Sequence, residues 1–199
     1  MPSLLPRAAP AWLTDPIVGA LSRLHVTPNV LTLAGVVGNM TAAVLAADGR
    51  FLVAGILMLA FSSLDFLDGA LARATGRATD FGSVFDAVMD RVSEAAVLFG
   101  LLVWFSNRGD RAEELLIFIA VASSILVSYV RARAEIVGIR LEEGLFTRAP
   151  RVVLLAAGLI IGQWEEDAIT VALWILAVAA SLTIVERLVR VLQKTAGRR

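Results

Sequence analysis

The chain has 199 residues, of which 58% are hydrophobic and 18% charged, and its mean hydropathy is +0.78. A soluble domain carries about half apolar and about a quarter charged residues, so the composition excludes an ordinary soluble domain. It predicts one helical membrane domain over residues 1–199. The net charge of zero excludes a basic field for nucleic acid, and the absence of cysteine excludes disulfides and thiolate metal sites.

The segment 1–26 precedes the first long apolar window. Between Trp12 and Leu24 its apolar residues predict an amphipathic interfacial helix that lies on the membrane. An ordinary helix packed at the edge of the bundle is the alternative. Prolines at positions 2, 6, 10 and 16 interrupt the segment, so it lacks the continuous apolar core of a cleavable signal peptide.

Residues 27–199 are predicted to form a six-helix transmembrane bundle. A helix needs about 20 apolar residues to cross about 30 Å of hydrocarbon, and such windows occur at 30–47, 51–74, 82–105, 112–134, 149–164 and 168–190. The windows lack the alternating pattern of membrane β-strands. The predicted fold class is therefore an all-α integral membrane protein with six transmembrane helices and an N-terminal interfacial helix.

The basic residues predict the orientation of this bundle. With both termini in the cytoplasm, Arg50, Arg108 and Arg111 face outward and the other fifteen of the 18 Lys and Arg residues face inward, as the positive-inside rule requires. Trp104 and Trp164 then lie at outer ends as interfacial anchors. We expect a multi-pass protein of the cell (inner) membrane whose cytoplasmic side carries the acidic residues described next.

Four aspartates interrupt the second and third windows. Asp65 and Asp68 are three residues apart, and Asp86 and Asp90 are four apart, so each pair shares one helix face. Two antiparallel helices joined by a short loop would bring all four carboxylates together. Charged groups inside a membrane are expensive and mark functional sites. Because carboxylate oxygens suit hard divalent cations, and the cation keeps the acids ionised, the cluster predicts a metal site.

Two other interpretations of these acids are open. Arg73, Arg77 and Arg91 are near enough in sequence to pair with them and form an inert charged rim. Intramembrane carboxylates also line the pathways of divalent-cation transporters. A transporter, however, would spread its acids through the membrane or break its helices at the midplane, whereas these acids lie toward one side with arginines nearby.

The acids belong to the pattern Asp-x2-Asp-Gly-x2-Ala-Arg-x8-Gly-x3-Asp-x3-Asp. The chain matches every defined position: Asp65, Asp68, Gly69, Ala72, Arg73, Gly82, Asp86 and Asp90. This pattern and the six-span layout resemble the CDP-alcohol phosphotransferase (CDP-alcohol phosphatidyltransferase) family. The resemblance implies a membrane enzyme that transfers a phosphatidyl group from CDP-diacylglycerol to a hydroxyl of a polar acceptor and releases CMP. A catalytically inactive homologue that acts as a scaffold is a further alternative, against which the intact motif speaks.

The same resemblance assigns roles to the motif. It implies that Asp65, Asp68 and Asp86 bind Mg²⁺ or Mn²⁺, as a pair of ions, and that Asp90 is the general base and also touches the metal. A carboxylate within hydrogen-bond reach can activate a hydroxyl in this way. Gly69 would let the nucleotide approach the helix backbone, and Arg73 would hold a phosphate.

Further residues are expected to bind the CDP-lipid together with Asp65, Gly69 and Arg73. They are the lead into the first span and a threonine before the third: Asn29, Val30, Leu31, Thr32 and Thr79. The assignment rests on the resemblance. Thr79 is suited equally well to cap the third helix.

A second constellation is predicted to bind the phosphate of the acceptor, because arginine forks match phosphate geometry. It consists of Ser128, Arg131, Arg133, Arg148, Arg151 and Arg187. The block from Ser128 to Glu135, followed by Arg148-x-x-Arg151, resembles the phosphatidylinositol phosphate synthase branch of the family. Inositol 1-phosphate is therefore the favoured acceptor, and glycerol 3-phosphate, the acceptor of phosphatidylglycerol phosphate synthases, is the runner-up. The alternative role of these arginines is positive-inside anchoring. The family resemblance also implies a homodimer.

Overall fold

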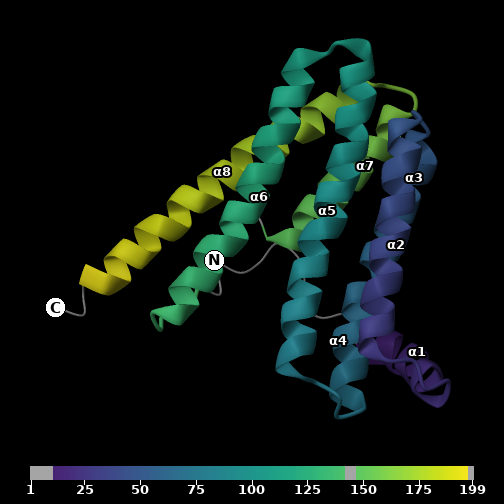
Figure 1. Ribbon diagram of the computed structural model, residues 1–199, viewed down its shortest axis with the longest axis vertical. Helices are drawn as coiled ribbons and strands as arrows, with labels where there is room; N and C mark the ends of the chain where they lie inside the picture. The colour runs from purple at the N-terminus through teal and green to yellow at the C-terminus, as the bar shows by residue number, and fades with distance from the viewer. Residues whose placement is uncertain (1–10, 142–146, 197–199) are drawn as a thin grey trace.

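The structure, a computed structural model, describes residues 11–141 and 147–196. Within these ranges it contains eight helices and no strands (Figure 1): α1 Ala11–Arg23, α2 Pro28–Ala47, α3 Phe51–Ser62, α4 Leu64–Ala74, α5 Asp80–Arg108, α6 Arg111–Ile136, α7 Arg148–Gly162 and α8 Asp167–Ala196. The all-α prediction is confirmed. Residues 1–10 of the predicted interfacial segment, and the side chains of Trp12 and Leu13, lie outside the described part.

Four helical stretches of the described chain are long and apolar enough to cross a membrane: Pro28–Ala47, Phe51–Ala74, Arg111–Ile136 and Asp167–Ala196. The other two predicted windows also coincide with helices, α5 and α7. However, α7 has only 15 residues, and the first half of α5 carries Asp86 and Asp90. The chain is thus a membrane protein with at least these four candidate spans.

The predicted window 51–74 is divided in the structure. Helix α3 ends at Ser62 and α4 begins at Leu64, while Ser63 between them keeps helical angles (φ −72°, ψ −18°). The Ser63 hydroxyl donates to the Ala60 carbonyl at 2.6 Å, a side-chain bond that competes with regular helical bonding. The division falls directly before Asp65, so Asp65 and Asp68 stand on a separate helix segment, α4.

Close packing of small residues holds the helices together. Helix α2 packs on α5, α3 on α7, and α6 on α8, and Figure 1 shows α2, α3 and α5 running side by side. A β-carbon added at Gly100 of α5 would lie only 2.1 Å from the Ala43 carbonyl oxygen of α2. Glycine is therefore needed at this crossing, as is common where membrane helices approach closely.

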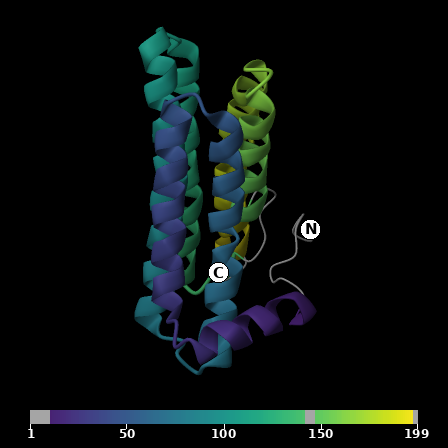
Figure 2. The same cartoon turned by 90° about the vertical axis from the view of Figure 1, so that its right-hand side faces the viewer.

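Helix α1 crosses the lower end of the bundle at a steep angle to the long helices (Figure 2). It packs against α4, and its Val18 is buried in a cluster with Leu31 and Leu71. Ile17 and Leu24 remain exposed. One side of α1 is therefore a packed bundle edge, and its exposed apolar residues suit contact with lipid.

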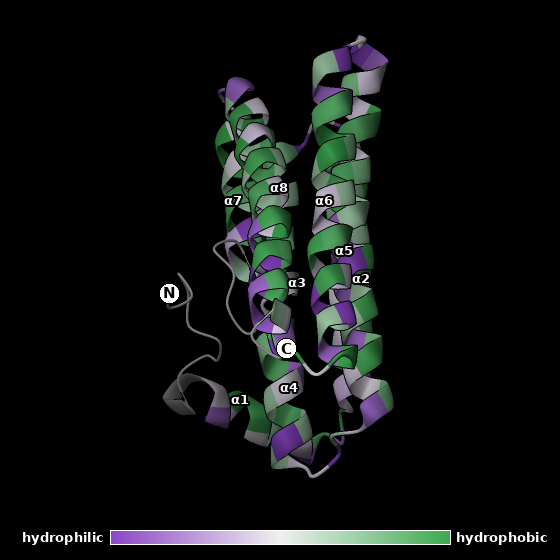
Figure 3. Ribbon diagram, turned by 90° about the vertical axis from the view of Figure 1, so that its left-hand side faces the viewer, coloured by the Kyte–Doolittle hydropathy of each residue, from purple (hydrophilic) through white to green (hydrophobic). Residues whose placement is uncertain are grey.

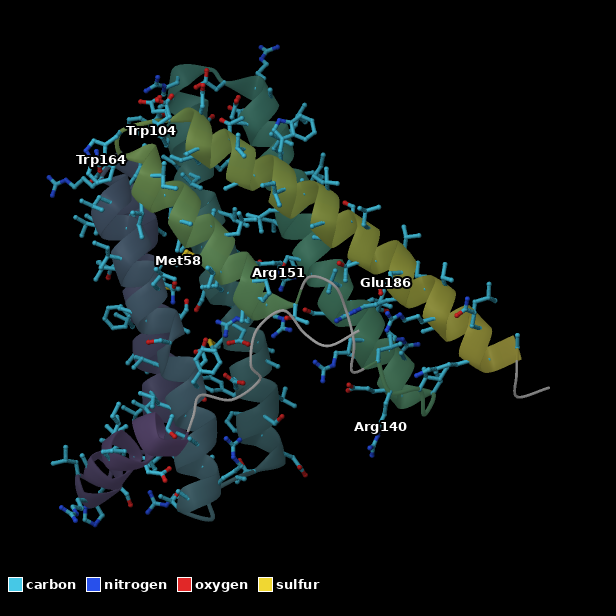
Figure 4. The ribbon with its side chains drawn as sticks, turned by 180° about the vertical axis from the view of Figure 1, so that it is seen from behind. Met58, Trp104, Arg140, Arg151, Trp164 and Glu186 are labelled. Carbon is cyan, nitrogen blue, oxygen red and sulfur yellow. The ribbon has the colours of Figure 1, made fainter. Side chains whose placement is uncertain are left out.

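The two ends of the bundle differ in chemistry. Hydrophobic residues cover most of the helix lengths, and hydrophilic residues gather near the loops and in the lower halves of several helices (Figure 3). Trp104 and Trp164 lie at the same end, as predicted, and Arg140 lies at the other (Figure 4). Trp104 makes an edge-to-face contact with Phe51 at 5.1 Å and a cation–π contact with Arg108 at 5.2 Å.

Candidate active site

Helices α4 and α5 bring three of the predicted acids together. One carboxylate oxygen from each of Asp65, Asp68 and Asp86 lies within 4.8 Å of the others. We call these residues the three-acid group. They come from two consecutive helices, as predicted, but Asp90, the fourth acid expected at this point, is not in the group.

The turn between α4 and α5 explains this convergence. After α4, the Arg77 amide donates to the Ala72 carbonyl at 3.0 Å, which closes the end of the helix. Gly76 there has φ +64°, a conformation that glycine adopts without steric cost. Thr79 then caps α5, its hydroxyl accepting from the Gly82 amide at 3.0 Å. The short turn reverses the chain and places both acidic faces together.

Helix α2 contributes a hydrogen bond to the three-acid group. The Thr32 hydroxyl donates to Asp68 Oδ2 at 2.7 Å, and both residues are buried. A hydrogen bond to a charged acceptor is stronger than a neutral one and fixes the carboxylate orientation. Thr32, predicted as a CDP-lipid contact, thus orients a candidate metal ligand in this structure.

Asp90 stands apart from the three-acid group but is connected to it by an arginine. Arg148 Nη1 contacts Asp65 and lies 3.0 Å from Asp90 Oδ1. Arg91 lies 3.4 Å from Asp90 Oδ2. Within the described ranges the ion-pair partners of these acids are Arg91 and Arg148, not Arg73 or Arg77, so the predicted inert rim involving Arg73 and Arg77 does not form.

The three-acid group fits a divalent cation. Its donors are all carboxylate oxygens, which hard cations such as Mg²⁺ and Mn²⁺ prefer. Asp86 Oδ1 is buried and has no hydrogen-bond partner among the described residues, and a buried polar atom of this kind is costly unless something binds it. Asp65, Asp68 and Asp86 are the residues that would hold the ion. A role for Asp90 in metal binding stays a prediction.

A buried charge pair lies beside the acids. Glu94 of α5 is 7% exposed and Arg151 of α7 is 3% exposed, with Arg151 Nε 3.2 Å from Glu94 Oε1. Glu94 Oε2 also accepts from the Ser124 hydroxyl at 2.8 Å. The view from behind shows Arg151 pointing into the bundle near its middle (Figure 4).

The predicted acceptor residues separate into a buried set and an exposed set. Arg151 and Arg187 are buried and Arg148 is half-buried, and Arg187 Nη1 donates to the Val127 carbonyl at 2.5 Å. Arg131 and Arg133 are exposed, and Arg131 pairs with Glu135 at 3.0 Å.

Ser128, the one hydroxyl of the predicted acceptor set, is half-buried. Its Oγ accepts two bonds from Arg91, at 3.0 Å from Nε and 2.8 Å from Nη2. Arg91 and Arg148 therefore contact the acids, whereas the exposed Arg131 pairs with Glu135.

The predicted CDP-lipid residues lie at the α2 and α5 starts and beside α4. A β-carbon added at Gly82 would lie 3.7 Å from Asn29 Oδ1, so Asn29 is a neighbour of a motif residue. Val30 is exposed and Leu31 is buried in the cluster with α1. Thr79 has the capping role that was its alternative.

Two further members of the nucleotide set stand on α4. Arg73 is exposed. A β-carbon added at Gly69 would lie 3.4 Å from Arg73 Nη1, so the arginine head group and the small residue of the motif are adjacent.

Sequence reasoning did not include Glu94 or Arg91 among the functional residues. Both contact predicted site residues: Glu94 holds Arg151, and Arg91 holds Ser128 and Asp90. The available signal was spacing, because Glu94 follows Asp90 by four residues and so continues the acidic face of the same helix.

Comparison with known proteins decides which class of protein this site belongs to. The sequence profile of the CDP-alcohol phosphatidyltransferases matches residues 25–185. The chain belongs to the CDP-alcohol phosphatidyltransferase family. It is therefore a transferase of phospholipid synthesis, which confirms the resemblance inferred from the aspartate pattern and sets aside the transporter interpretation.

Curated relatives and solved structures agree over nearly the whole chain. The phosphatidylinositol phosphate synthase of Mycobacteroides abscessus is 38% identical over 196 residues, covering 94% of this chain and 87% of that protein. The crystal structure of the Mycobacterium tuberculosis phosphatidylinositol phosphate synthase with CDP-DAG bound superposes with a TM-score of 0.84 at 35% identity, covering 91% of this chain and 94% of that one. Its complex with manganese and citrate gives a TM-score of 0.83 at 35% identity, with coverages of 89% and 88%.

Proposed function

We propose that this CDP-alcohol phosphatidyltransferase transfers the phosphatidyl group of CDP-diacylglycerol to inositol 1-phosphate, forming phosphatidylinositol phosphate and CMP. The observation that carries the choice of a phosphorylated acceptor is a set of buried arginine nitrogens on α7 and α8. Arg148 Nε, Arg151 Nη1 and Arg187 Nε are buried and have no hydrogen-bond partner among the described residues. Such donors are costly unless an anion accepts from them. A phosphate oxygen supplies that acceptor.

The proposed reaction is a single displacement at phosphorus. The acceptor hydroxyl oxygen forms a bond to the lipid-side phosphorus, the bond from that phosphorus to the bridging oxygen breaks, and CMP leaves with that oxygen. Asp90 takes the hydroxyl proton as general base. Its side chain is 14% exposed, so a substrate bound in the site would shield the transferred proton from bulk water.

Asp65, Asp68 and Asp86 are proposed as ligands of a pair of Mg²⁺ or Mn²⁺ ions, and Asp90 is proposed to contact the metal as well. Bound there, divalent cations neutralise charge that develops on the leaving CMP. Thr32 orients Asp68 through its hydrogen bond of 2.7 Å. Asn29, Val30, Leu31, Gly69, Arg73 and Thr79 are proposed to contact the CDP-lipid with Asp65.

The acceptor phosphate is proposed to bind Arg148, Arg151 and Arg187, with Ser128, Arg131 and Arg133 at the rim. Arg187 lies close enough to Arg131 and Arg151 for their positive charges to act on it, so a phosphate bound among them would relieve that repulsion. Glu94 would hold Arg151 in position, because both of its carboxylate oxygens are used by Arg151 and Ser124.

We further propose one domain over residues 1–199, with a six-span bundle over 27–199 in which α5 and α7 complete the four candidate spans. The packing of α5 on α2 and of α7 on α3 and α8 supports this arrangement. Helix α1, within segment 1–26, would lie in the interface of the cell (inner) membrane, and the site would face the cytoplasm. A homodimer stays a prediction.

The test is an acceptor panel with purified protein, Mg²⁺ and CDP-diacylglycerol. Released CMP and the lipid product, identified by mass spectrometry, are measured with inositol 1-phosphate, glycerol 3-phosphate and unphosphorylated inositol. We expect inositol 1-phosphate to give the highest kcat/KM, and Arg151→Ala to raise its KM. A preference for glycerol 3-phosphate would replace the acceptor assignment and leave the family chemistry standing.

The base assignment has its own test. Asp90→Asn keeps the size and polarity of the side chain but removes its capacity to accept a proton, so CMP release should be lost. CMP release at the wild-type rate in this variant would refute Asp90 as the base.

A further inference from the structure

Arg148 makes a contact that the transfer reaction does not explain. It is the first residue of α7, and its Nη1 contacts Asp65 on α4 and lies 3.0 Å from Asp90 on α5. Only 22% of its side chain is exposed, and 17% and 14% of the two carboxylates. One guanidinium nitrogen thus joins a candidate metal ligand to the candidate base.

This contact conflicts with two expected functions. Asp65 Oδ2 accepts from Arg148, yet Asp65 is also a member of the three-acid group that fits a divalent cation. A cation held by Asp65 would repel the guanidinium at close range. Asp90, in turn, is less available to accept a proton while Arg148 and Arg91 both hold it.

The other contacts of Arg148 allow its guanidinium to move. Its Nε is buried without a hydrogen-bond partner among the described residues, so no second bond fixes the root of the guanidinium. The described interactions that hold its head group are those with Asp65 and Asp90. Arg151, one turn later on α7, also has an Nε without a hydrogen-bond partner in the described part of the chain, but its Nη2 donates to Glu94 at 3.3 Å and its Nε lies 3.2 Å from the other oxygen of that same carboxylate.

We propose that Arg148 and the divalent cation compete for the Asp65 carboxylate, and that metal binding releases the Arg148 guanidinium from Asp65 and Asp90 toward the acceptor phosphate. The destination of the released group rests on the proposed function. Arg148 then acts as a positioning residue that couples three events. It neutralises the acids before the metal arrives, it frees Asp90 to accept a proton, and it presents a donor to the phosphate. Coupling of this kind is reciprocal: whatever the metal does to phosphate affinity, phosphate does to metal affinity.

The first experiment measures Mn²⁺ affinity by electron paramagnetic resonance of free Mn²⁺ in detergent-solubilised protein. Arg148→Gln removes the competing charge, so we expect Mn²⁺ to bind about tenfold more tightly, within the range of ordinary coupling effects. Arg140→Gln is the matched control, because it removes one positive charge from an exposed position at the lower end of the bundle. It should leave the affinity within about twofold, since exposed charges are screened.

An Arg148 that competes with the metal and an Arg148 that only supports the acids predict opposite changes in Mn²⁺ affinity. If Arg148 were a permanent counterion that holds the carboxylates together, Arg148→Gln would bind Mn²⁺ more weakly. Unchanged or weaker binding therefore overturns the proposal. Arg148→Met is a second variant that also removes the charge but keeps a long side chain at this partly buried position. If Arg148→Gln does not fold, as judged by thermal melting, tighter Mn²⁺ binding by Arg148→Met supports competition, and equal or weaker binding overturns it.

The second experiment tests the destination with inorganic phosphate as the probe. In the wild-type protein, phosphate affinity measured by calorimetry should rise when Mn²⁺ is present, and this gain should be lost in Arg148→Gln. An equal gain in the variant would overturn the release toward phosphate.

Neither measurement requires turnover, so the two proposals can fail separately. Tighter Mn²⁺ binding by Arg148→Gln, together with a protein that makes no phosphatidylinositol phosphate, would retain the competition and reject the proposed acceptor. Wild-type enzyme that makes phosphatidylinositol phosphate, together with unchanged Mn²⁺ binding by Arg148→Gln, would retain the proposed acceptor and reject the competition.

Discussion

The buried pair between Glu94 and Arg151 offers a sharp test of how the site is held together. The perturbation is Glu94→Gln, which keeps the shape of the side chain and its acceptor oxygen for Ser124 but removes its charge. Arg151 is 3% exposed, so it cannot regain solvation from water. Removing one partner of a buried ion pair leaves an uncompensated charge and typically costs about 3–5 kcal/mol.

The structure sets where in this range the loss should fall. Two Arg151 nitrogens contact Glu94, at 3.2 Å and 3.3 Å, and Arg151 Nη1 has no hydrogen-bond partner among the described residues. Because few other contacts compensate the guanidinium charge, the free energy of unfolding should fall by about 4 kcal/mol. The double variant Glu94→Gln with Arg151→Met removes both charges and should return stability to near that of the wild type.

The assay is reversible unfolding by sodium dodecyl sulfate in mixed micelles, followed by tryptophan fluorescence. Glu135→Gln is the matched control, because Glu135 forms an exposed pair with Arg131 at 3.0 Å and exposed pairs of this spacing contribute only about 0.3–0.5 kcal/mol. A loss of less than about 1 kcal/mol in Glu94→Gln, or a double variant no more stable than the single one, would refute the reasoning that Glu94 compensates Arg151.

Three other predictions follow from single contacts. Thr32→Val removes the hydroxyl that donates to Asp68 at 2.7 Å, so Mn²⁺ affinity should fall about tenfold, while Thr32→Ser should retain it; equal affinities in both would count against the orienting role. Asp90→Asn should weaken Mn²⁺ binding less than Asp86→Asn does, because the three-acid group includes Asp86 and not Asp90; an equal loss in the two variants would contradict this ranking of the acids. Gly100→Ala places a methyl group 2.1 Å from a carbonyl oxygen of α2 and should cost at least about 1–3 kcal/mol in the same unfolding assay. Gly19→Ala, where nothing lies within 4 Å, should not destabilise the protein.

The helices and the acids were predictable because their signals are local. Apolar windows of roughly the length that crosses a bilayer and aspartates spaced three and four residues apart are read directly from the chain. The division of the second window at Ser63 was not predicted, because apolar composition continues through it. The four-residue spacing from Asp90 to Glu94 was visible, but its partner Arg151 lies 57 residues further on.

The acceptor region shows the same limit. The sequence alone does not divide the predicted acceptor residues into buried and exposed ones: Ser128, Arg131, Arg133, Arg148, Arg151 and Arg187. Only the packing of α5, α6, α7 and α8 separates the buried arginines from the exposed ones. Thr32 was placed near the nucleotide by resemblance, and its hydrogen bond to Asp68 depends on the crossing of α2 and α4.

Hydropathy and helical periodicity alone indicate a helical membrane protein in which one turn brings acids together, because both signals act over a few residues. The arginine that each acid contacts depends instead on how the helices pack. Asp65 and Asp90 meet Arg148, and Glu94 meets Arg151, across helices far apart in the chain. Such pairs depend on distances between packed helices, and no local pattern in the sequence encodes those distances.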